Sequence, residues 1–261
     1  MGSLDGRTAL VAGASRGIGE YMAKALAAAG AKVAVAARTV EVTDKRLPGT
    51  IHSVAQSINE SGGEAVPVVM NMRNPESISA GVAEAAEKMG GLDIVINNAA
   101  ILVPGTLESV LDRHIELIWQ VDLRGPLLLM KAALPHLKNA GAGDLINISS
   151  IAAVFPGPGP YQDVRQGDGA FYGMVKAGLE RASQGLAREL QADNIKVNVL
   201  SPQGRIKTPG NIWAENDPDN PTLEFEAADE MAKSSVWICE QPNTFTGHIL
   251  YDQDLCKEQN L

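Results

Sequence analysis

The stretch Gly13-Ala14-Ser15-Arg16-Gly17-Ile18-Gly19 lies between a short apolar run, Thr8–Ala12, and an Ala-rich stretch of helical period, Ile18–Ala29. Glycines at a strand–helix junction allow a tight turn and let backbone amides approach a pyrophosphate at the positive end of the helix. The spacing is GxxxGxG, which differs from the GxGxxG of ordinary dinucleotide-binding domains. Taken alone, the stretch fits either a dinucleotide site or a simple turn between a strand and a helix.

Short Val/Ile-rich runs alternate with longer stretches of helical period along the whole chain. Strands of continuous apolar character are typical of a parallel sheet buried on both faces, and the alternation indicates βαβ units. We therefore expect an α/β fold, a doubly wound Rossmann-type parallel sheet in a single domain over residues 1–261. The expected strands are Thr8–Ala12, Lys32–Ala37, Ala65–Met70, Asp93–Asn97, Asp144–Ser149, Lys196–Leu200 and Ile249–Asp252. The expected helices are Ile18–Ala29, Ile51–Glu60, Pro75–Met89, Asp112–Leu137 and Tyr172–Gln191.

Three connections are longer than a compact α/β unit requires: Thr39–Thr50, Phe155–Phe171 and Gln203–Glu226. The last two follow strands, so we expect them at the carboxyl edge of the sheet, where open α/β folds bind ligands. The sequence thus predicts substrate loops at about 155–171 and 203–226. An apolar wall for the substrate is expected from four side chains in these loops, Phe155, Tyr161, Ile212 and Trp213.

The composition narrows the classes of partner. The 261 residues carry a net charge of -9, which argues against nucleic acid or an anionic membrane as a partner, because both select for basic patches. The four histidines are scattered and predict no metal site, and Cys239 and Cys256 predict reduced thiols. The chain shows no signal-peptide pattern and no apolar stretch long enough to cross a bilayer, so the expected location is the cytoplasm.

Four further motifs follow the glycine-rich stretch in a fixed order. They are Asn97-Asn98-Ala99-Ala100 after the fourth strand, Ser149-Ser150 at the end of the fifth, Tyr172-Gly173-Met174-Val175-Lys176, and Pro202-Gln203-Gly204 with Thr208. Together with GxxxGxG, this series resembles the short-chain dehydrogenase/reductase family along almost the whole chain. The resemblance implies a Rossmann-type fold, a nicotinamide cofactor and a hydride transfer between the cofactor and a carbonyl or alcohol carbon.

The charges at the end of the second strand favour NADP(H) over NAD(H). NAD-using proteins carry an acidic residue there, which accepts hydrogen bonds from the ribose hydroxyls. Here that position is Ala37, Arg38 follows it, and Arg16 stands in the glycine-rich stretch. Two guanidinium groups suit a 2′-phosphate; the alternative is that both arginines merely face solvent.

The resemblance also implies a set of cofactor-binding residues. Asn71, with Met72 beside it, stands where the family has an Asp that contacts adenine, and Ile206 and Thr208 would reach the nicotinamide carboxamide. One extra residue before Gly204 leaves the register of that last pair open. The full set is Gly13, Ser15, Arg16, Gly17, Ile18, Gly19, Arg38, Asn71, Met72, Asn98, Ala99, Tyr172, Lys176, Ile206 and Thr208.

The expected catalytic residues are Ser150, Tyr172, Lys176 and Asp122. Tyr172 and Lys176 share one helix face, and a nearby ammonium stabilises a phenolate, so Tyr172 can donate a proton in reduction and accept one in oxidation. By the resemblance, Ser150 stabilises charge on the substrate oxygen, whereas Ser149 is a structural neighbour. Tyr161 has no lysine four residues later and is not a competing acid/base.

One position departs from the family pattern. Val121-Asp122-Leu123-Arg124-Gly125 has an Asp where the family commonly has an Asn that holds a water for the proton relay to the lysine. Two roles stay open for Asp122: a direct part in the relay, or a structural carboxylate bonded to backbone.

The sequence therefore predicts an NADP(H)-dependent oxidoreductase for a hydrophobic or ring-bearing ketone or secondary alcohol. The alternative is a catalytically weak or inactive NADP(H)-binding regulatory protein on the same fold, an idea that Asp122 supports. The resemblance also implies a homo-oligomer, a tetramer or dimer, built on the two long helices Asp112–Leu137 and Tyr172–Gln191.

Overall fold

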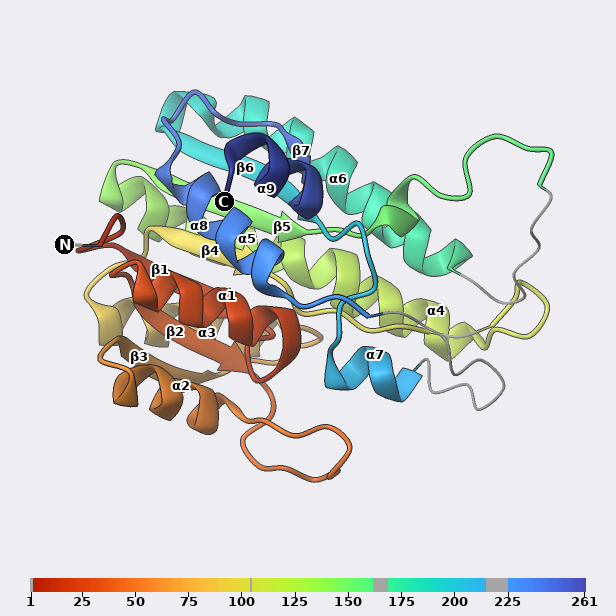
Figure 1. Cartoon of the computed structure of the whole chain (residues 1–261), viewed down its shortest axis with the longest axis horizontal. Helices are drawn as coiled ribbons and strands as arrows, with labels where there is room; N and C mark the ends of the chain where they lie inside the picture. The colour runs from red at the N-terminus through yellow and green to blue at the C-terminus, as the bar shows by residue number, and fades with distance from the viewer. Residues whose placement is uncertain (1, 104, 162–168, 215–224) are drawn as a thin grey trace.

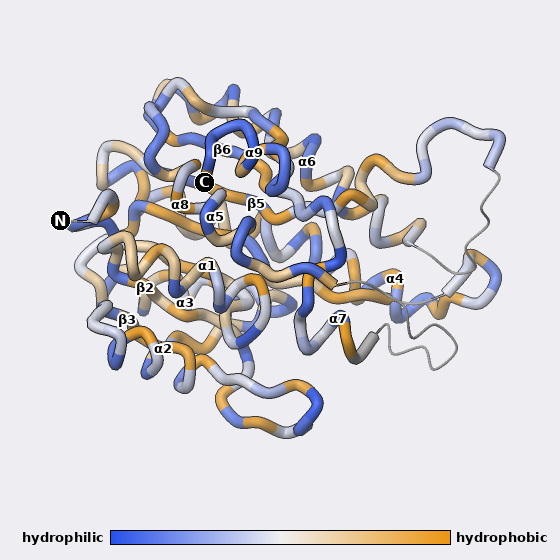
Figure 2. The backbone as a smooth tube through the Cα atoms, in the orientation of Figure 1, coloured by the Kyte–Doolittle hydropathy of each residue, from blue (hydrophilic) through white to orange (hydrophobic). Residues whose placement is uncertain are grey.

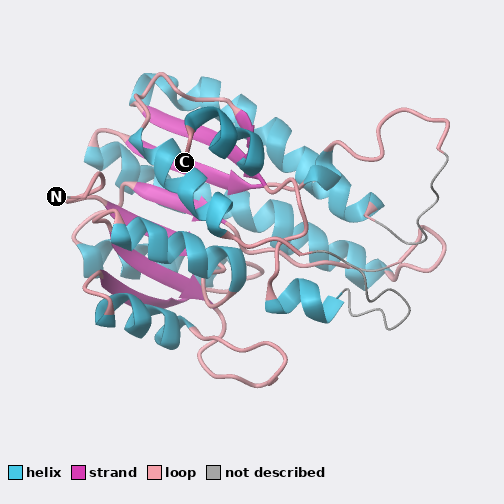
Figure 3. Ribbon diagram, in the orientation of Figure 1, coloured by secondary structure: helices cyan, strands magenta, loops and turns pink. Residues whose placement is uncertain are grey.

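The computed structural model of the chain describes residues 2–103, 105–161, 169–214 and 225–261. Within these residues a seven-stranded parallel sheet has the order β3-β2-β1-β4-β5-β6-β7. Helices cover both of its faces (Figures 1 and 3). The doubly wound α/β fold expected from the sequence is confirmed.

Strands and helices alternate along the chain as expected. The strands are β1 Thr8–Ala12, β2 Lys32–Ala37, β3 Glu64–Val69, β4 Ile94–Asn97, β5 Gly143–Ile148, β6 Ile195–Ser201 and β7 Ile249–Tyr251. The α-helices of the described residues are α1 Gly17–Ala28, α2 Ile51–Glu60, α3 Pro75–Met89, α4 Asp112–Trp119, α5 Gly125–Ala140, α6 Ala170–Leu190, α7 Pro209–Ala214, α8 Asp229–Glu240 and α9 Asp252–Gln259. A π-helix, η1, spans Gln120–Arg124, and short 3₁₀ helices span η2 Ile151–Ala153 and η3 Gln191–Asp193.

The sheet separates two hydrophobic cores. Successive side chains of β1 alternate between them, with Val11 in the core beneath α1, α2 and α8 and Leu10 in the core beneath α3, α5 and α6. A strand whose two faces are both covered reads as a continuous apolar run, which is why the fully buried β1 and β4 could be expected from the sequence.

The prediction of a single helix over Asp112–Leu137 is wrong. That segment is divided into α4 and α5 by the π-helix η1, which contains Asp122. Pro126, in the first turn of α5, has no N–H to donate to the carbonyl four residues earlier, which belongs to Asp122. The ladder of i to i−4 hydrogen bonds is therefore interrupted where the π-helix lies.

Three helices were not expected from the sequence. α7 lies inside the connection 203–226, which is thus not all loop. α8 buries Ser234 and Ser235 on its inner face, so polar residues interrupt the apolar pattern by which a helix is predicted from sequence. α9 is almost entirely hydrophilic (Figure 2) and begins at Asp252, which was expected to end the last strand. α6 begins at Ala170, so Phe171 belongs to the helix and not to the preceding loop.

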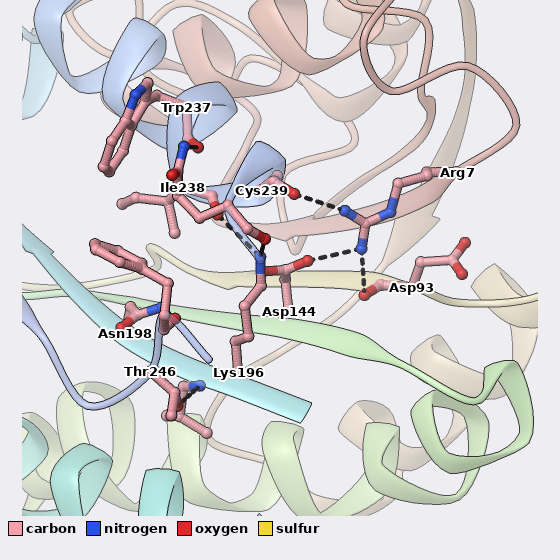
Figure 4. Close-up of polar contacts among 12 residues, drawn as sticks. Arg7, Asp93, Asp144, Lys196, Asn198, Trp237, Ile238, Cys239 and Thr246 are labelled. Carbon is pink, nitrogen blue, oxygen red and sulfur yellow. Dashed lines mark hydrogen bonds and ion pairs between the residues drawn. The ribbon is translucent and has the colours of Figure 1, made fainter. Parts of the chain in front are cut away.

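At the amino ends of the strands, a buried ion cluster ties β5 and β6 to α8 (Figure 4). Asp144 and Lys196 are directly opposite each other on the two strands, and their charged atoms lie 2.9 Å apart. Arg7, just before β1, approaches Asp144 within 2.7 Å and also donates to the Cys239 carbonyl oxygen at the end of α8. The cluster therefore satisfies backbone groups at a helix end as well as pairing charges.

The helices of the described residues include none that is long and apolar enough to cross a membrane.

Candidate functional site

The glycine-rich turn joins β1 to α1 and closes against the segment that follows β4. Gly13 has φ +78°, and a Cβ there would lie 2.6 Å from the Cα of Ala99. The side-chain amide of Asn98 donates to the Gly13 carbonyl oxygen over 3.0 Å, and a Cβ on Gly19 would lie 2.4 Å from the same oxygen. Larger side chains do not fit at these glycines, so the turn packs closely against the segment after β4. The turn lies between β1 and β4, where the strand order reverses, and doubly wound sheets bind ligands at this point.

The start of α1 is open to a ligand. Arg16 is the N-cap residue, and its side chain makes no capping hydrogen bond to the first amides of the helix. Gly17 has φ +60° and packs against Thr208, whose Cγ2 lies 3.0 Å from the position of a Cβ; Ser15 is buried and Ile18 is half-buried. Free amides at a helix N-terminus bind anionic groups such as a pyrophosphate.

Two arginines flank the turn on the side of β2. The strand ends at Ala37, and the exposed Arg38 follows it. Arg16 is half-buried, and burial together with the neighbouring charge of Arg38 lowers the pKa of its guanidinium. The structure thus brings the two guanidinium groups near each other at a strand end that carries no acidic side chain.

Asn71 and Met72 follow β3 at the same edge of the sheet. The side-chain oxygen of Asn71 accepts a hydrogen bond from the Arg73 amide at 3.1 Å, so a local turn uses the acceptor that the resemblance assigns to adenine. Met72 is buried, and its carbonyl oxygen lies 2.7 Å from where a Cβ on Gly125 would stand. These two residues therefore border the start of α5.

Ile206 and Thr208 follow β6 and are both buried. Ile206 forms a parallel bridge with Glu226, and Thr208 Oγ1 accepts from the Asn211 amide at 3.0 Å in the first turn of α7. With its contact to Gly17, Thr208 lies beside the glycine-rich turn, as a residue that reaches a dinucleotide must.

Tyr172 and Lys176 lie on one face of α6, with the Lys176 Nζ 5.4 Å from the centroid of the Tyr172 ring. The ammonium is buried and donates to the Ile148 carbonyl oxygen at 2.9 Å. This hydrogen bond fixes the lysine to the end of β5, two residues before Ser150. The strand end thus positions both the ammonium and the serine.

Ser150 is the N-cap residue of the 3₁₀ helix η2, and its Oγ accepts from the Ala152 amide at 3.2 Å. A Cβ on Gly173 would lie 2.5 Å from the Ala152 carbonyl oxygen, so the first turn of α6 packs directly on η2. The segments that carry Ser150 and Tyr172 are therefore in contact despite the long connection between them.

Asp122 lies in the π-helix and is fully buried. Its Oδ1 accepts from the Ile101 amide at 3.0 Å, and its Oδ2 lies 3.9 Å from the Lys176 Nζ, without a hydrogen-bond partner among the described residues. Burial raises the pKa of Asp122 to about 6, while the Lys176 charge and the Ile101 amide act in the opposite direction. The carboxylate thus has a backbone bond on one oxygen and faces the lysine with the other.

Glu180 is a buried acid near this site that the sequence reasoning missed. It follows Lys176 by four residues on α6, and its Oε1 accepts from the Ser149 hydroxyl at 2.6 Å. Burial raises its pKa, with the Ser149 hydrogen bond and the Lys176 charge opposing that shift. The i, i+4 spacing from Lys176 was the signal that could have identified it.

A chain of buried amides supports the site from below. Asn97 donates to Asn147 at 2.7 Å, Asn147 donates to the Ser183 hydroxyl at 2.9 Å, and that hydroxyl donates to a backbone carbonyl of α6. Buried polar groups require partners, so this chain fixes β4 and β5 to the helix that carries Tyr172. Asn147 and Ser183 belong to no motif, and nothing in the sequence marked them.

The loops at this edge carry exposed apolar side chains, as the expected substrate wall requires. Phe155 is 66% exposed, Tyr161 57% and Ile212 41%. The side chain of Trp213 and residues 162–168 and 215–224 of the two expected substrate loops lie outside the described residues.

The donor set fits a dinucleotide. Glycines that leave no room for a Cβ line a turn at a helix N-terminus, and cationic groups stand at the end of β2. Among the described residues, no group of three or more His, Cys, Asp or Glu side chains could hold a metal ion.

Comparisons with known proteins agree with this geometry. The family model described as short chain dehydrogenase matches residues 7–218. Hydroxysteroid dehydrogenase-like protein 2 of Bos taurus is 34% identical over 266 residues, covering 100% of this chain and 60% of the relative, and the Homo sapiens protein is 34% identical over 263 residues with the same shares. The chain therefore spans about 60% of the length of these curated relatives.

Solved structures give the same result. A short chain dehydrogenase from Mycobacterium thermoresistibile matches with a TM-score of 0.84 and 30% identity, over 99% of this chain and 89% of that one. A dehydrogenase/reductase from Sinorhizobium meliloti 1021 matches with a TM-score of 0.78 and 31% identity, over 95% and 94% of the two chains.

Proposed function

The chain belongs to the short-chain dehydrogenase family, and on that premise we propose that it is an NADP(H)-dependent oxidoreductase acting between a ketone and a secondary alcohol. The observation that carries the proposal is the pair on α6: a buried Lys176 ammonium 5.4 Å from the ring of Tyr172, anchored beside Ser150. A positioned hydroxyl next to a fixed cation is what general acid–base catalysis at a carbonyl oxygen needs.

The bound dinucleotide would supply a hydride in reduction and accept one in oxidation. In reduction, the Tyr172 hydroxyl donates its proton to the substrate oxygen as the carbonyl carbon receives the hydride, and in oxidation the phenolate takes that proton back. The Lys176 ammonium stabilises the phenolate and would bind the nicotinamide ribose hydroxyls. Ser150 donates a hydrogen bond to the substrate oxygen as charge develops there.

The preference for the phosphorylated cofactor rests on Arg16 and Arg38. Each charge-assisted hydrogen bond to a 2′-phosphate contributes about 1.5–3 kcal/mol, and Ala37 offers no carboxylate to repel that phosphate. Gly13, Ser15, Gly17, Ile18 and Gly19 would hold the pyrophosphate. Asn71, Met72, Asn98 and Ala99 would border the adenosine, and Ile206 and Thr208 the nicotinamide.

We propose a hydrophobic, ring-bearing substrate. The exposed apolar side chains of Phe155, Tyr161 and Ile212 support this choice, because apolar surface at a site mouth gains by burial against an apolar ligand. The names of the relatives, hydroxysteroid dehydrogenase-like proteins, point to the same chemical class. The proposal includes a cytoplasmic homo-oligomer, a location that suits the two buried free thiols, Cys239 and Cys256.

The alternative is an NADP(H)-binding protein that has lost turnover, and the observation that favours it is the carboxylate of Asp122 at the relay position. Turnover separates the two functions. The alternative predicts NADPH binding by the wild type with no reduction of any apolar cyclic ketone in a panel.

Tyr172→Phe tests the proposal directly. The variant keeps the ring and its packing but removes the proton donor, so NADPH binding should be unchanged and turnover should fall by about 10²–10⁴-fold. Tyr21→Phe is the matched control, since it removes the hydroxyl of an exposed tyrosine on α1 that has no role in the proposal, and it should leave turnover unchanged. Near-normal turnover in Tyr172→Phe would refute the assignment of the acid/base.

A further inference from the structure

The connection between β2 and α2, residues 39–50, forms a closed loop beside the glycine-rich turn. Its ends are joined by a hydrogen bond of 3.1 Å from the Ile51 amide to the Thr39 carbonyl oxygen. Figure 1 shows the loop, in orange, extending from the sheet beyond the carboxyl ends of β2 and β3. Thr50 then caps α2 through a reciprocal pair of hydrogen bonds with Ser53, so the last residues of the loop are fixed in place.

The last turn of the loop rests on the glycine-rich turn itself. Gly49 has φ +99°, a conformation that L side chains rarely adopt. A Cβ on Gly49 would lie 2.3 Å from the carbonyl oxygen of Ser15 and 3.3 Å from the Cβ of Arg16. The two turns are therefore in direct backbone contact, and only glycine permits it.

This contact fixes the guanidinium group of Arg16. Its Nε donates to the Pro48 carbonyl oxygen at 3.0 Å, and one terminal nitrogen donates to the Gly49 carbonyl oxygen at 3.1 Å. A guanidinium has five N–H donors, so about three remain for another acceptor. Carbonyl oxygens orient the group without neutralising its charge. Burial, and after it the neighbouring charge of Arg38, lower the pKa of Arg16, so an anionic ligand would relieve an unpaired charge here.

We propose that the 39–50 loop is a specificity-determining element, which holds Arg16 beside Arg38 so that the two guanidinium groups form one receptor for a 2′-phosphate. The inference rests on the proposed NADP(H) dependence and adds the positioning role of Pro48 and Gly49. Because a guanidinium that is already oriented loses less side-chain entropy on binding, the loop raises affinity for the phosphorylated ligand and not for its unphosphorylated analogue.

The experiment is calorimetric titration of the full chain with two probes, adenosine 2′,5′-bisphosphate and 5′-AMP, which differ only in the 2′-phosphate. The wild type should bind the bisphosphate more tightly. Gly49→Ala should reduce the ratio of the two affinities by at least about tenfold, the value of one charge-assisted contact. Gly62→Ala is the matched control, because Gly62 has φ +87° at the other end of α2 with open space around it, and its ratio should equal that of the wild type.

Arg16→Lys gives a second test that does not strain the backbone. Lysine keeps the charge but cannot donate to two carbonyls and a phosphate in the fixed geometry of a guanidinium, so the ratio should fall here too. An unchanged ratio in Gly49→Ala or Arg16→Lys, or an equal loss of both affinities, would overturn the role of the loop. Equal affinities in the wild type would instead refute the proposed cofactor preference, before any variant is compared.

Discussion

Among the described residues, two buried Lys–Asp pairs lie at opposite edges of the sheet, and they differ in how closely their charged atoms approach each other. At the amino edge, Lys196 lies 2.9 Å from Asp144, and Arg7 approaches the same carboxylate within 2.7 Å. At the carboxyl edge, Lys176 and Asp122 are 3.9 Å apart. Both lysines are almost fully buried, so the difference lies in the pairing and not in exposure.

The two pairs also differ in their remaining donors and acceptors. The Lys196 ammonium donates to the Ile238 and Gln241 carbonyl oxygens, which leaves it fully engaged (Figure 4). The Lys176 ammonium has one backbone acceptor, and Asp122 Oδ2 lies 3.9 Å from it, beyond hydrogen-bond distance. Incomplete satisfaction of buried charges is costly, and it persists where a ligand completes the set. The comparison therefore separates a closely matched ion pair from a looser one, and the proposed function assigns the reaction to the looser pair.

Lys176→Met should give the largest effect, and the effect should be on turnover. We expect turnover to fall by about 10²–10⁴-fold, with weaker cofactor binding, because the ammonium serves both Tyr172 and the ribose. The free energy of unfolding should change less than it does in Lys196→Met. Burial already raises the pKa of both Asp122 and Glu180, so these acids can take up protons when the ammonium is removed. Steady-state kinetics and urea unfolding measure the two quantities. A variant that retains turnover but loses stability would reverse the proposed division.

Lys196→Met should show the opposite result. Removal of one partner from a buried ion pair costs about 3–5 kcal/mol in the free energy of unfolding, because the other charge and two carbonyls lose their partner. Turnover per folded molecule should match the wild type. Lys88→Met is the control, since it breaks an exposed pair with Glu84 that contributes about 0.3–0.5 kcal/mol. Loss of turnover in folded Lys196→Met would show that the two edges are coupled.

The two edges also differ in how far the sequence predicts them. The strands were predictable because short apolar runs alternate with stretches of helical period, and β1 and β2 match the expected residues at both ends. The ion cluster was not predictable, because Asp144 and Lys196 lie within strands and meet only through the register of β5 and β6. Sequence spacing carries no information on cross-strand partners of this kind.

At the carboxyl edge, motif spacing located Tyr172, Lys176 and the glycine-rich turn, because these contacts are local or follow strand ends. Motif spacing did not predict the π-helix around Asp122, because that helix depends on the missing N–H of Pro126. It also did not predict that Glu180 accepts a hydrogen bond from Ser149. The contact of Gly49 with the glycine-rich turn was also outside its reach, since it depends on how a 12-residue connection closes.

Asp122→Asn should give the smallest effect, which appears as a change in how the free energy of unfolding depends on pH. The pKa of Asp122 is raised to about 6 in the folded protein, above its value of about 3.9 in an unfolded chain. Between these two values the folded state binds more protons, so wild-type stability should decline as pH rises, by about 2–3 kcal/mol in total, and stay level above pH 6. The Asn variant has no such group, and its stability should lack this decline. Urea unfolding at pH 4.5 to 8 measures both curves.

The kinetic counterpart decides between the two roles left open for Asp122. If the carboxylate takes part in the proton relay through its free Oδ2, kcat/KM of the wild type should fall as Asp122 becomes protonated below about pH 6, and this limb should be absent in Asp122→Asn. Asp144→Asn is the control from the opposite edge, because burial also raises the pKa of Asp144, yet that carboxylate faces Arg7 and Lys196. Its folded fraction should keep the wild-type pH profile. An Asp122→Asn variant with the wild-type limb intact would assign Asp122 to backbone support of Ile101 alone, and the relay would have to run through other groups around Lys176.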